Sequence, residues 1–265
     1  MKKRISGALA AALVLGTVAP SAFAATSFND IDSSYAKQAI LELADKGILS
    51  GVGNGQFNPQ GTLTREQFAT IVVKALGLQA NATTSSFTDV SGWSVPYVEA
   101  AYKAGIIAGV GGGKFNPTGI VTREQAAAIL VKAAQYQKVS VDLNAPLNFS
   151  DASQVSDWAK QYVAAAAKLG LVKGADGKFD PQGNATREAA AALAKNLLTA
   201  IQTANYQITP GTANLAVGQA QQFSVPGAKS VVWSVSGNGV IDQNGNFVGT
   251  APGSATITAV ADGKT

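Results

Sequence analysis

Three arginines occupy equivalent positions in a segment that occurs three times in the chain. Arg65, Arg123 and Arg187 each follow a threonine, precede a glutamate and lie eight residues after a phenylalanine. A guanidinium is planar and carries five N–H donors, which suit a carboxylate or a phosphate. We therefore expect each arginine to bind an anion or to pair with an acid inside the protein.

The threonine before each arginine is typical of a helix N-cap. Thr64 with Gln67 and Thr122 with Gln125 have the capping-box spacing, whereas the third copy has Ala189 in place of the glutamine. The arginine then falls at the first helical position, where the helix dipole disfavours a cation by about 0.3–1 kcal/mol. Because an arginine occurs at this position in all three copies, we expect each arginine to have a partner that compensates for this cost. The free N–H groups of a helix start would add donors for an anion.

Two interpretations of the arginines remain open at this point. The partner could be internal: the adjacent glutamates, or the aspartates of an earlier Phe-x-Asp motif, namely Asp30, Asp89 and Asp151. Alternatively, each arginine could lie in a cleft between neighbouring copies and receive an acidic ligand. An aromatic residue in each copy could pack on a sugar ring or lie in the core: Tyr35, Trp93 and Trp158.

A glycine-rich loop precedes each arginine. A first glycine (Gly47, Gly105, Gly170) ends an apolar helix, and a second (Gly51, Gly109, Gly174) follows four residues later. We expect these glycines to permit positive φ and a close approach of backbone to ligand. None of the three loops contains Gly-Lys-Ser/Thr, which excludes a phosphate-binding loop of that type here. The loop phenylalanine (Phe57, Phe115, Phe179) should pin each loop to the core, and the third loop is one residue shorter.

Composition excludes several classes of chemistry. The chain has no Cys and no His, so it has no Cys or His nucleophile, no His base and no usual zinc site. The carboxylates fall at caps and on helix surfaces, so we expect no enzyme, no metal site and no cofactor. Without the three basic residues at positions 2–4, 17 basic residues face 16 acidic ones. That balance predicts no nucleic-acid partner.

The chain divides into a leader, three copies and a tail. Residues 1–24 have the basic, apolar and small-residue regions of a secretory signal peptide, with cleavage expected after Ala24. The copies are expected at 25–80, 81–140 and 141–204. Residues 205–265 carry short β-prone runs, with Asn244-Gly245 as a hairpin turn. The tail ends without a closing strand, so we expect the natural protein to continue beyond Thr265.

The ordered motifs resemble the S-layer homology (SLH) domain family over about residues 27–200. Phe-x-Asp, the Gly-Ile/Leu helix stop, the loop ending in Phe-x-Pro and Thr-Arg-Glu recur three times in order. The family pattern usually continues Thr-Arg-Ala-Glu, whereas here it reads Thr-Arg-Glu-Gln twice and Thr-Arg-Glu-Ala once. The tail looks like a group 2 bacterial Ig-like domain. The implied fold is multidomain: a mainly α pseudo-threefold SLH trimer, shaped as a three-prong spindle, followed by an incomplete all-β Ig-like sandwich.

The resemblance implies a function without catalysis. Such domains anchor exported proteins non-covalently to secondary cell-wall polysaccharide, in many cases through a pyruvate ketal on N-acetylmannosamine. It implies a secreted protein of the cell wall or S-layer, which self-associates into a lattice mostly through regions beyond this chain and has no membrane partner. The carbohydrate-binding candidates, by matching position, are Arg65, Arg123, Arg187, Asp30, Asp89, Asp151, Gly51, Gly109, Gly174, Tyr35, Trp93, Trp158, Gln56, Lys114 and Lys178.

The copies differ, so three equal grooves are not expected. Tyr35 replaces the tryptophan of the other copies, and the third copy has a shorter loop and no capping box. We expect the groove that uses the third loop to be the weakest or empty. The alternative for the whole protein is the same anchor carrying an enzyme or adhesin encoded beyond residue 265.

Overall fold

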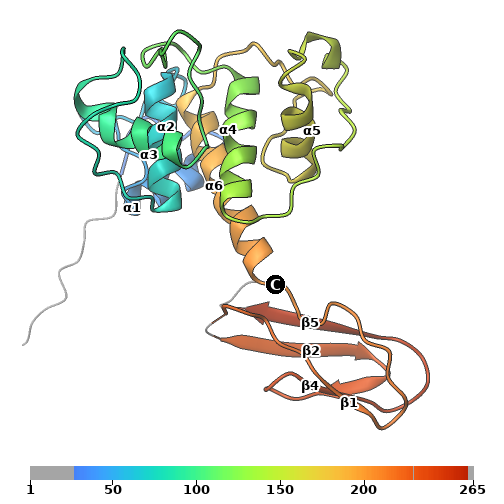
Figure 1. The fold of residues 1–265 in the computed structure, drawn as a ribbon. Coiled ribbons are helices and arrows are strands. Elements are labelled where there is room, and N and C mark those ends of the chain that lie inside the picture. The colour runs from blue at the N-terminus through green and yellow to red at the C-terminus, as the bar shows by residue number, and fades with distance from the viewer. Residues whose placement is uncertain (1–26, 229, 262–265) are drawn as a thin grey trace, which may run out of the picture.

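The computed structural model describes residues 27–228 and 230–261, so the expected signal peptide lies outside the described residues. Six α-helices precede five strands in this part of the chain. The helices are α1 (Lys37–Asp45), α2 (Arg65–Leu76), α3 (Val95–Lys103), α4 (Arg123–Tyr136), α5 (Lys160–Lys168) and α6 (Arg187–Asn205), with short 3₁₀ turns η1 (Gly92–Ser94) and η2 (Ala152–Gln154) before α3 and α5. Each copy therefore supplies two helices (Figure 1).

The helices of different copies pack against one another in a closed order. The second helix of each copy contacts the first helix of the next: α2 packs on α3, α4 on α5, and α6 returns to α1. The second helices α2, α4 and α6 also contact each other. Isolated backbone bridges join the segments in front of them, at Thr62 with Thr186, Thr64 with Ile120 and Thr122 with Asn184. No copy thus completes its packing alone.

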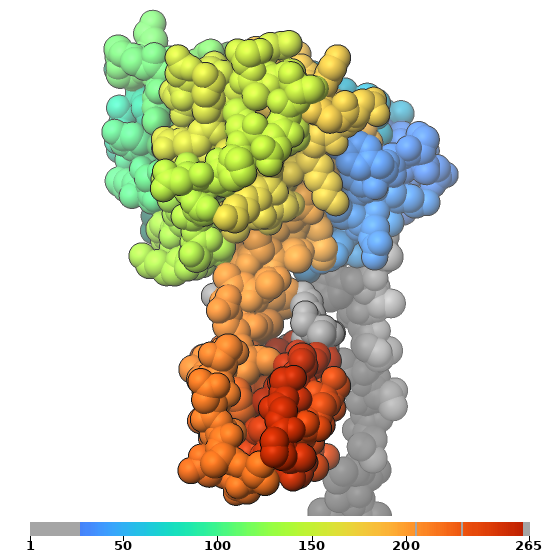
Figure 2. Space-filling model, turned by 90° about the vertical axis from the view of Figure 1, so that its right-hand side faces the viewer, coloured from blue at the N-terminus to red at the C-terminus, as the bar shows by residue number. Residues whose placement is uncertain are grey.

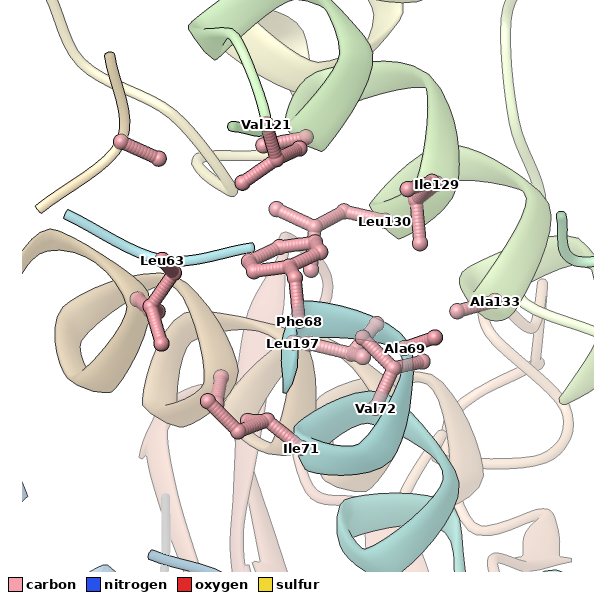
Figure 3. Close-up of a cluster of buried hydrophobic side chains, with 14 of the residues drawn as sticks. Leu63, Phe68, Ala69, Ile71, Val72, Val121, Ile129, Leu130, Ala133 and Leu197 are labelled. Atoms are coloured by element: carbon pink, nitrogen blue, oxygen red, sulfur yellow. The ribbon is translucent and has the colours of Figure 1, made fainter. Parts of the chain in front are cut away.

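The core lies where the three second helices meet. Phe68 and Leu130 are almost fully buried there, with Leu197 from α6 (Figure 3). Leu63 and Val121, from the segments before α2 and α4, close the cluster from one end. Burial of each such side chain stabilises the fold by roughly 1.5–3 kcal/mol relative to exposure. This shared core holds the three helix starts, and hence the three arginines, in fixed relation.

The ends of the helices follow the sequence signals. Capping boxes form at Thr64 with Gln67 and at Thr122 with Gln125, and Thr186 caps α6 without a reciprocal bond, as predicted. Gly47, Gly105 and Gly170 have φ near +68°, which confirms the left-handed helix stop. The loop phenylalanines are buried, as predicted.

The sequence also places Asp32 to Ser34, Ser94 and Ser156 to Asp157 where N-caps of the first helices would be expected, but that prediction is wrong. No side chain caps α1, α3 or α5. The hydroxyls of Ser34 and Ser156 instead donate to glutamates of another copy. Donation to a carboxylate leaves the lone pairs of the hydroxyl oxygen free, and the Ser34 oxygen also accepts the N–H of Ala36 at 3.2 Å.

The tail forms two small antiparallel sheets. Strand β4 (Asn246–Gly249) pairs with β1 (Ala220–Gln222) and with β3 (Gly239–Ile241), and β2 (Val231–Gly237) pairs with β5 (Ala255–Ala261). The predicted Asn244-Gly245 hairpin is confirmed: Val240 faces Val248, and Gly245 has a φ of 84°. Asp242 fixes the turn by accepting the N–H groups of Asn244 and Asn246.

Candidate functional site

The arginine of each copy reaches into the loop of the next copy. Arg65 donates from Nε to the Phe115 carbonyl oxygen at 3.0 Å and from Nη2 to the Ala108 carbonyl oxygen at 3.2 Å. Arg123 makes the equivalent bonds to Phe179 and Lys173 at 2.8 and 3.1 Å, and Arg187 to Phe57 and Ser50 at 2.7 and 2.6 Å. In the described residues the internal partner is therefore main-chain oxygen, and neither class of acid expected from the sequence pairs directly with the guanidinium.

Each guanidinium also lies over the loop phenylalanine. The distances from Cζ to the ring centroid are 4.6 Å for Arg65, 5.1 Å for Arg123 and 4.5 Å for Arg187. Burial lowers the pKa of Arg65 and of Arg187, while the charges of Asp89 and Asp30 act in the opposite direction. The loop bonds occupy two of the five N–H donors in Arg123 and Arg187. Donors remain for a ligand.

The expectation that free N–H groups at the helix starts would receive the anion was wrong. The N–H of Arg65 donates to the Gly119 carbonyl oxygen at 2.8 Å, and that of Glu66 to the Pro117 carbonyl oxygen at 3.0 Å. The starts of α4 and α6 are satisfied in the same way by the next loop in the ring. Because the neighbouring copy supplies these acceptors, the arginine side chain is the group left to meet an anion.

The aspartates of the Phe-x-Asp motif hold the loops. The two carboxylate oxygens of Asp89 accept the N–H groups of Phe115 and Asn116 at 2.8 Å each, and Asp30 and Asp151 make the same pair of bonds in their own copies. The bonds from the loop N–H groups hold the pKa of all three carboxyls below its usual value, with that of the phenylalanine N–H the largest cause. The lining residues of the two grooves described below do not include these aspartates.

The second loop glycines are required by packing within the loop. A Cβ at Gly109 would lie 2.5 Å from the Lys114 carbonyl oxygen and 2.7 Å from Cε1 of Phe87, and Gly51 and Gly174 are equally crowded. Their φ is not positive, contrary to expectation. The positive values belong to the turn tip, at Asn54-Gly55, Gly112-Gly113 and Asp176-Gly177. Gln56 and Lys114 are exposed loop residues.

A groove of about 380 Å³, groove A, gathers residues from all three copies. Arg65 comes from the first copy, residues 106–110 and the α4 side chains Gln125 and Lys132 from the second, and Trp158 from the third. Gln125 also accepts from Nη1 of Arg65 at 3.3 Å. Trp158 is 51% exposed, so it is not the buried core aromatic that remained possible from the sequence.

Groove B, of about 530 Å³, is its counterpart one copy further round the ring. Arg123 comes from the second copy, residues 172–175 and 178–180 with the α6 side chain of Asn196 from the third, and Tyr35 from the first. Gly174 and Lys178, both predicted site residues, line this groove. Tyr35 is 71% exposed.

The third set of equivalent residues, site C, comprises Arg187, Ser50 to Phe57, Gln67, Lys74 and Trp93. Arg187 contacts the loop through its bonds to Ser50 and Phe57. Trp93 lies in η1, which packs against α2, the helix that carries Gln67 and Lys74. Trp93 is 56% exposed.

The sequence differences between copies meet in groove B. Lys132 lies nine residues after Arg123, and its Nζ is 5.7 Å from the ring centroid of Tyr162. Lys74 lies nine residues after Arg65, and its Nζ is 5.9 Å from the ring centroid of Tyr97. Their counterpart in groove B is Asn196, and the counterpart of the two tyrosines is Ala39. Groove B also has Ala189 for glutamine, Tyr35 for tryptophan and the shorter loop. The lysines were missed as site residues, although their fixed spacing from the arginines could have revealed them.

The glutamates after Arg123 and Arg187 link copies. Glu124 is buried and accepts the N–H and the hydroxyl of Ser156 in the third copy, at 3.0 and 2.8 Å. Glu188 accepts the Ser34 hydroxyl of the first copy at 2.6 Å. These carboxylates are structural, and they fix the residues beside Trp158 and Tyr35.

No group of three or more acidic, Cys or His residues that could hold a metal ion occurs in residues 27–228 and 230–261. Among the helices of this part of the chain, none has the length and apolarity needed to cross a membrane.

Comparison with known proteins finds similarity to bacterial enzymes and to bacterial surface-layer proteins. Over 179 residues the chain is 39% identical to an amylopullulanase of Thermoanaerobacterium thermosulfurigenes, with 65% of this chain and 9% of that protein covered. It is 35% identical over 232 residues to the Surface-layer 125 kDa protein of Lysinibacillus sphaericus (84% and 19%), and 33% identical over 198 residues to the S-layer protein sap of Bacillus anthracis (73% and 24%). The chain spans less than a quarter of the length of these relatives.

A family model matches the repeated segments themselves. Its three matches cover residues 27–69, 86–127 and 148–191, and each includes one Phe-x-Asp motif, one glycine loop and one Thr-Arg-Glu. The matched segments are therefore those that build the arginine–loop contacts. The chain belongs to the S-layer homology domain family and carries three such domains in tandem.

Proposed function

We propose that this chain anchors a surface protein non-covalently to the bacterial cell wall by binding an acidic, pyruvylated secondary cell-wall polysaccharide. Groove A is the main support for this proposal, because it brings two cationic side chains, Arg65 and Lys132, together with an exposed Trp158. A carboxylate on a sugar needs such a combination: charged donors for the acid and an aromatic face for the ring. The pyruvate ketal itself is implied by the family resemblance.

The expected affinity of one groove is modest. A hydrogen bond to a charged group contributes about 1.5–3 kcal/mol, and part of that is offset by ordering the ligand. Arg65 already uses three donors within the protein, which holds it in place before binding. Many subunits in a surface lattice would add avidity without new contacts.

The three sites should differ in affinity for one ligand. Site C repeats the arginine, lysine, glutamine and tryptophan of groove A, whereas groove B has Asn196, Ala189 and Tyr35 at these positions. Groove B also has the smaller Ala175 in the place of Val110, which lines groove A. These differences support the interpretation that groove B is the weakest site for the pyruvylated sugar.

The same proposal includes the wider architecture. We take the domains as a leader at 1–24, SLH copies at 25–80, 81–140 and 141–204, and an Ig-like sandwich at 205–265. The cyclic packing of α2 on α3, α4 on α5 and α6 on α1 supports a pseudo-threefold arrangement. The S-layer relatives support a place in the cell wall or S-layer, with self-association through regions beyond this chain.

The alternative is that the anchor delivers an enzyme or adhesin. The amylopullulanase and an exoglucanase of Acetivibrio thermocellus, 38% identical over 179 residues, favour it. The Lysinibacillus surface-layer protein matches 84% of this chain, compared with 65% for each of those two enzymes and 78% for an endoglucanase of Bacillus sp. (strain KSM-635). The sequence of the full-length protein decides between the two. We assign no catalysis to the residues in hand, and release of reducing sugar by this chain would overturn that.

Binding to isolated cell walls tests the proposal. Purified protein should cosediment with walls and should lose most of that binding after mild acid removes the pyruvate ketals. Trp158→Ala should weaken binding to untreated walls, whereas Tyr136→Ala, at an exposed aromatic outside grooves A and B, should not. Unchanged binding after removal of pyruvate would contradict the proposed recognition.

A further inference from the structure

The ring of helices contains one interface between copies that are not joined by a linker. Helices α2 and α3 belong to consecutive copies, as do α4 and α5, but α6 packs against α1 from the opposite end of the helical region. Figure 2 shows this contact as the blue first copy beside the amber third copy. We call the α1–α6 interface the seam.

An ion-pair network holds the seam. Lys195 on α6 donates to both carboxylate oxygens of Glu42 on α1, at 2.6 and 2.5 Å, and Lys46 adds a third bond at 2.8 Å. These bonds, with that from Lys195 the largest cause, lower the pKa of Glu42 to about 2. Glu42 is therefore charged at any pH in which the protein would work.

The other two interfaces lack this network. The positions that correspond to Glu42 are Ala100 on α3 and Ala165 on α5, and those that correspond to Lys195 are Val73 on α2 and Val131 on α4. The two valines are buried. If α1 packed on α2 or α4, Glu42 would face a valine and keep only Lys46 of its own copy as a partner, which is less favourable for a partly buried charge. The pair thus specifies that α1 meets α6.

The three ligand sites depend on the seam to different degrees. Groove A uses Arg65, α4 and Trp158, which meet only across interfaces of consecutive copies. Groove B needs Tyr35 of the first copy against α6 of the third. Site C needs Arg187 of the third copy in the loop of the first. Groove B and site C therefore each cross the seam, and groove A does not.

We propose that Glu42 and Lys195 are positioning residues that lock the seam and thereby complete groove B and site C, while groove A is complete without them. The lock itself is independent of any ligand, and only its effect on binding rests on the function proposed above. Opening of the seam would leave a chain with one working site.

The test uses Lys195→Glu, which places two carboxylates face to face. The reciprocal Glu42→Lys/Lys195→Glu variant should restore the attraction. The matched control is Lys168→Glu, which breaks a similar exposed pair with Asp142 (2.7 Å) outside the seam. Hydrogen exchange in α1 should accelerate at least tenfold in Lys195→Glu, remain unchanged in α4, and return to the original rate in the double variant. Lys195→Met, which removes only the charge, replaces Lys195→Glu if that variant does not fold.

Titration with the methyl glycoside of pyruvylated N-acetylmannosamine measures the consequence for binding. Lys195→Glu should retain one site, and adding Trp158→Ala should abolish it. Unchanged exchange in α1, equal acceleration in α1 and α4, or loss of groove A together with the others would overturn the proposal. If the glycoside does not bind the unsubstituted protein, the proposed function fails, and the exchange experiment still decides whether the lock exists.

Discussion

The guanidinium of Arg65 lies over the ring of Phe115, with Cζ 4.6 Å from the ring centroid, and its Nε donates to the carbonyl oxygen of the same residue at 3.0 Å. One side chain of the first copy thus supports the loop of the second. This explains why a cation recurs at a helix start, where the dipole disfavours it: the loop carbonyls and the ring stabilise the charge. A ligand anion would be a further partner.

Removal of this arginine should destabilise the fold. Arg65→Ala leaves the Phe115 and Ala108 carbonyl oxygens without their donor, and we expect the free energy of unfolding to fall by about 1.5–3 kcal/mol. Arg123→Ala should cost less, because Arg123 is less buried and its Cζ lies further from its ring, at 5.1 Å. Urea titration measures both. Equal free energies of unfolding for the unsubstituted protein, Arg65→Ala and Arg123→Ala would mean that the arginine does not support the loop.

Stability should depend on pH through the loop aspartates. The pKa of Asp89 is lower in the folded protein than its usual 3.8. Its contribution is therefore fully present above about pH 4 and is lost as the pH falls through the folded pKa. Asp30 and Asp151 act alike. Asp89→Asn should lower the melting temperature at pH 7 and flatten its fall between about pH 5 and 2. A slope as steep as that of the unsubstituted protein would contradict this account.

A methyl group at the second loop glycine should deform groove A. Gly109→Ala would place Cβ 2.5 Å from the Lys114 carbonyl oxygen, and overpacking of this kind costs about 1–3 kcal/mol. The glycoside should then bind one site fewer. Gly211→Ala is the control, because its Cβ would meet nothing within 4 Å. Unfolding curves and titration check both variants, and a harmless Gly109→Ala would show that the loop can shift.

The lysine nine residues after the arginine should set the difference between the grooves. An exposed charge pair contributes about 0.2–1 kcal/mol, so Lys132→Asn should weaken glycoside binding in groove A by up to about fivefold. Asn196→Lys should strengthen groove B by a similar factor. Calorimetric titration at low salt measures both changes. Identical affinities in all variants would show that these lysines do not reach the ligand.

Much of the local structure could be predicted from the sequence. The Thr-Arg-Glu helix starts, the glycine helix stops and the Asn244-Gly245 hairpin depend on a few neighbouring residues, and all three were found as expected. The inward position of the loop phenylalanines followed from their apolar character. Such features are local, so spacing along the chain is sufficient to indicate them.

The contacts between copies could not be predicted in the same way. The bond from Arg65 to Phe115 and that from Ser34 to Glu188 span 50 and 154 residues, and no local pattern indicates which copy meets which. For the same reason, the sequence alone does not indicate that Tyr35 and the short third loop belong to one groove. The closed order of helices brings both into groove B.

Titration of the unsubstituted protein with two methyl glycosides, N-acetylmannosamine with and without the pyruvate ketal, tests the central claim most directly. The two sugars differ only in the group that carries the carboxylate. We predict binding of the pyruvylated sugar, with affinity that falls as salt rises, and at least tenfold weaker binding of the neutral one. Equal affinity for both would contradict recognition of an anion by the arginines.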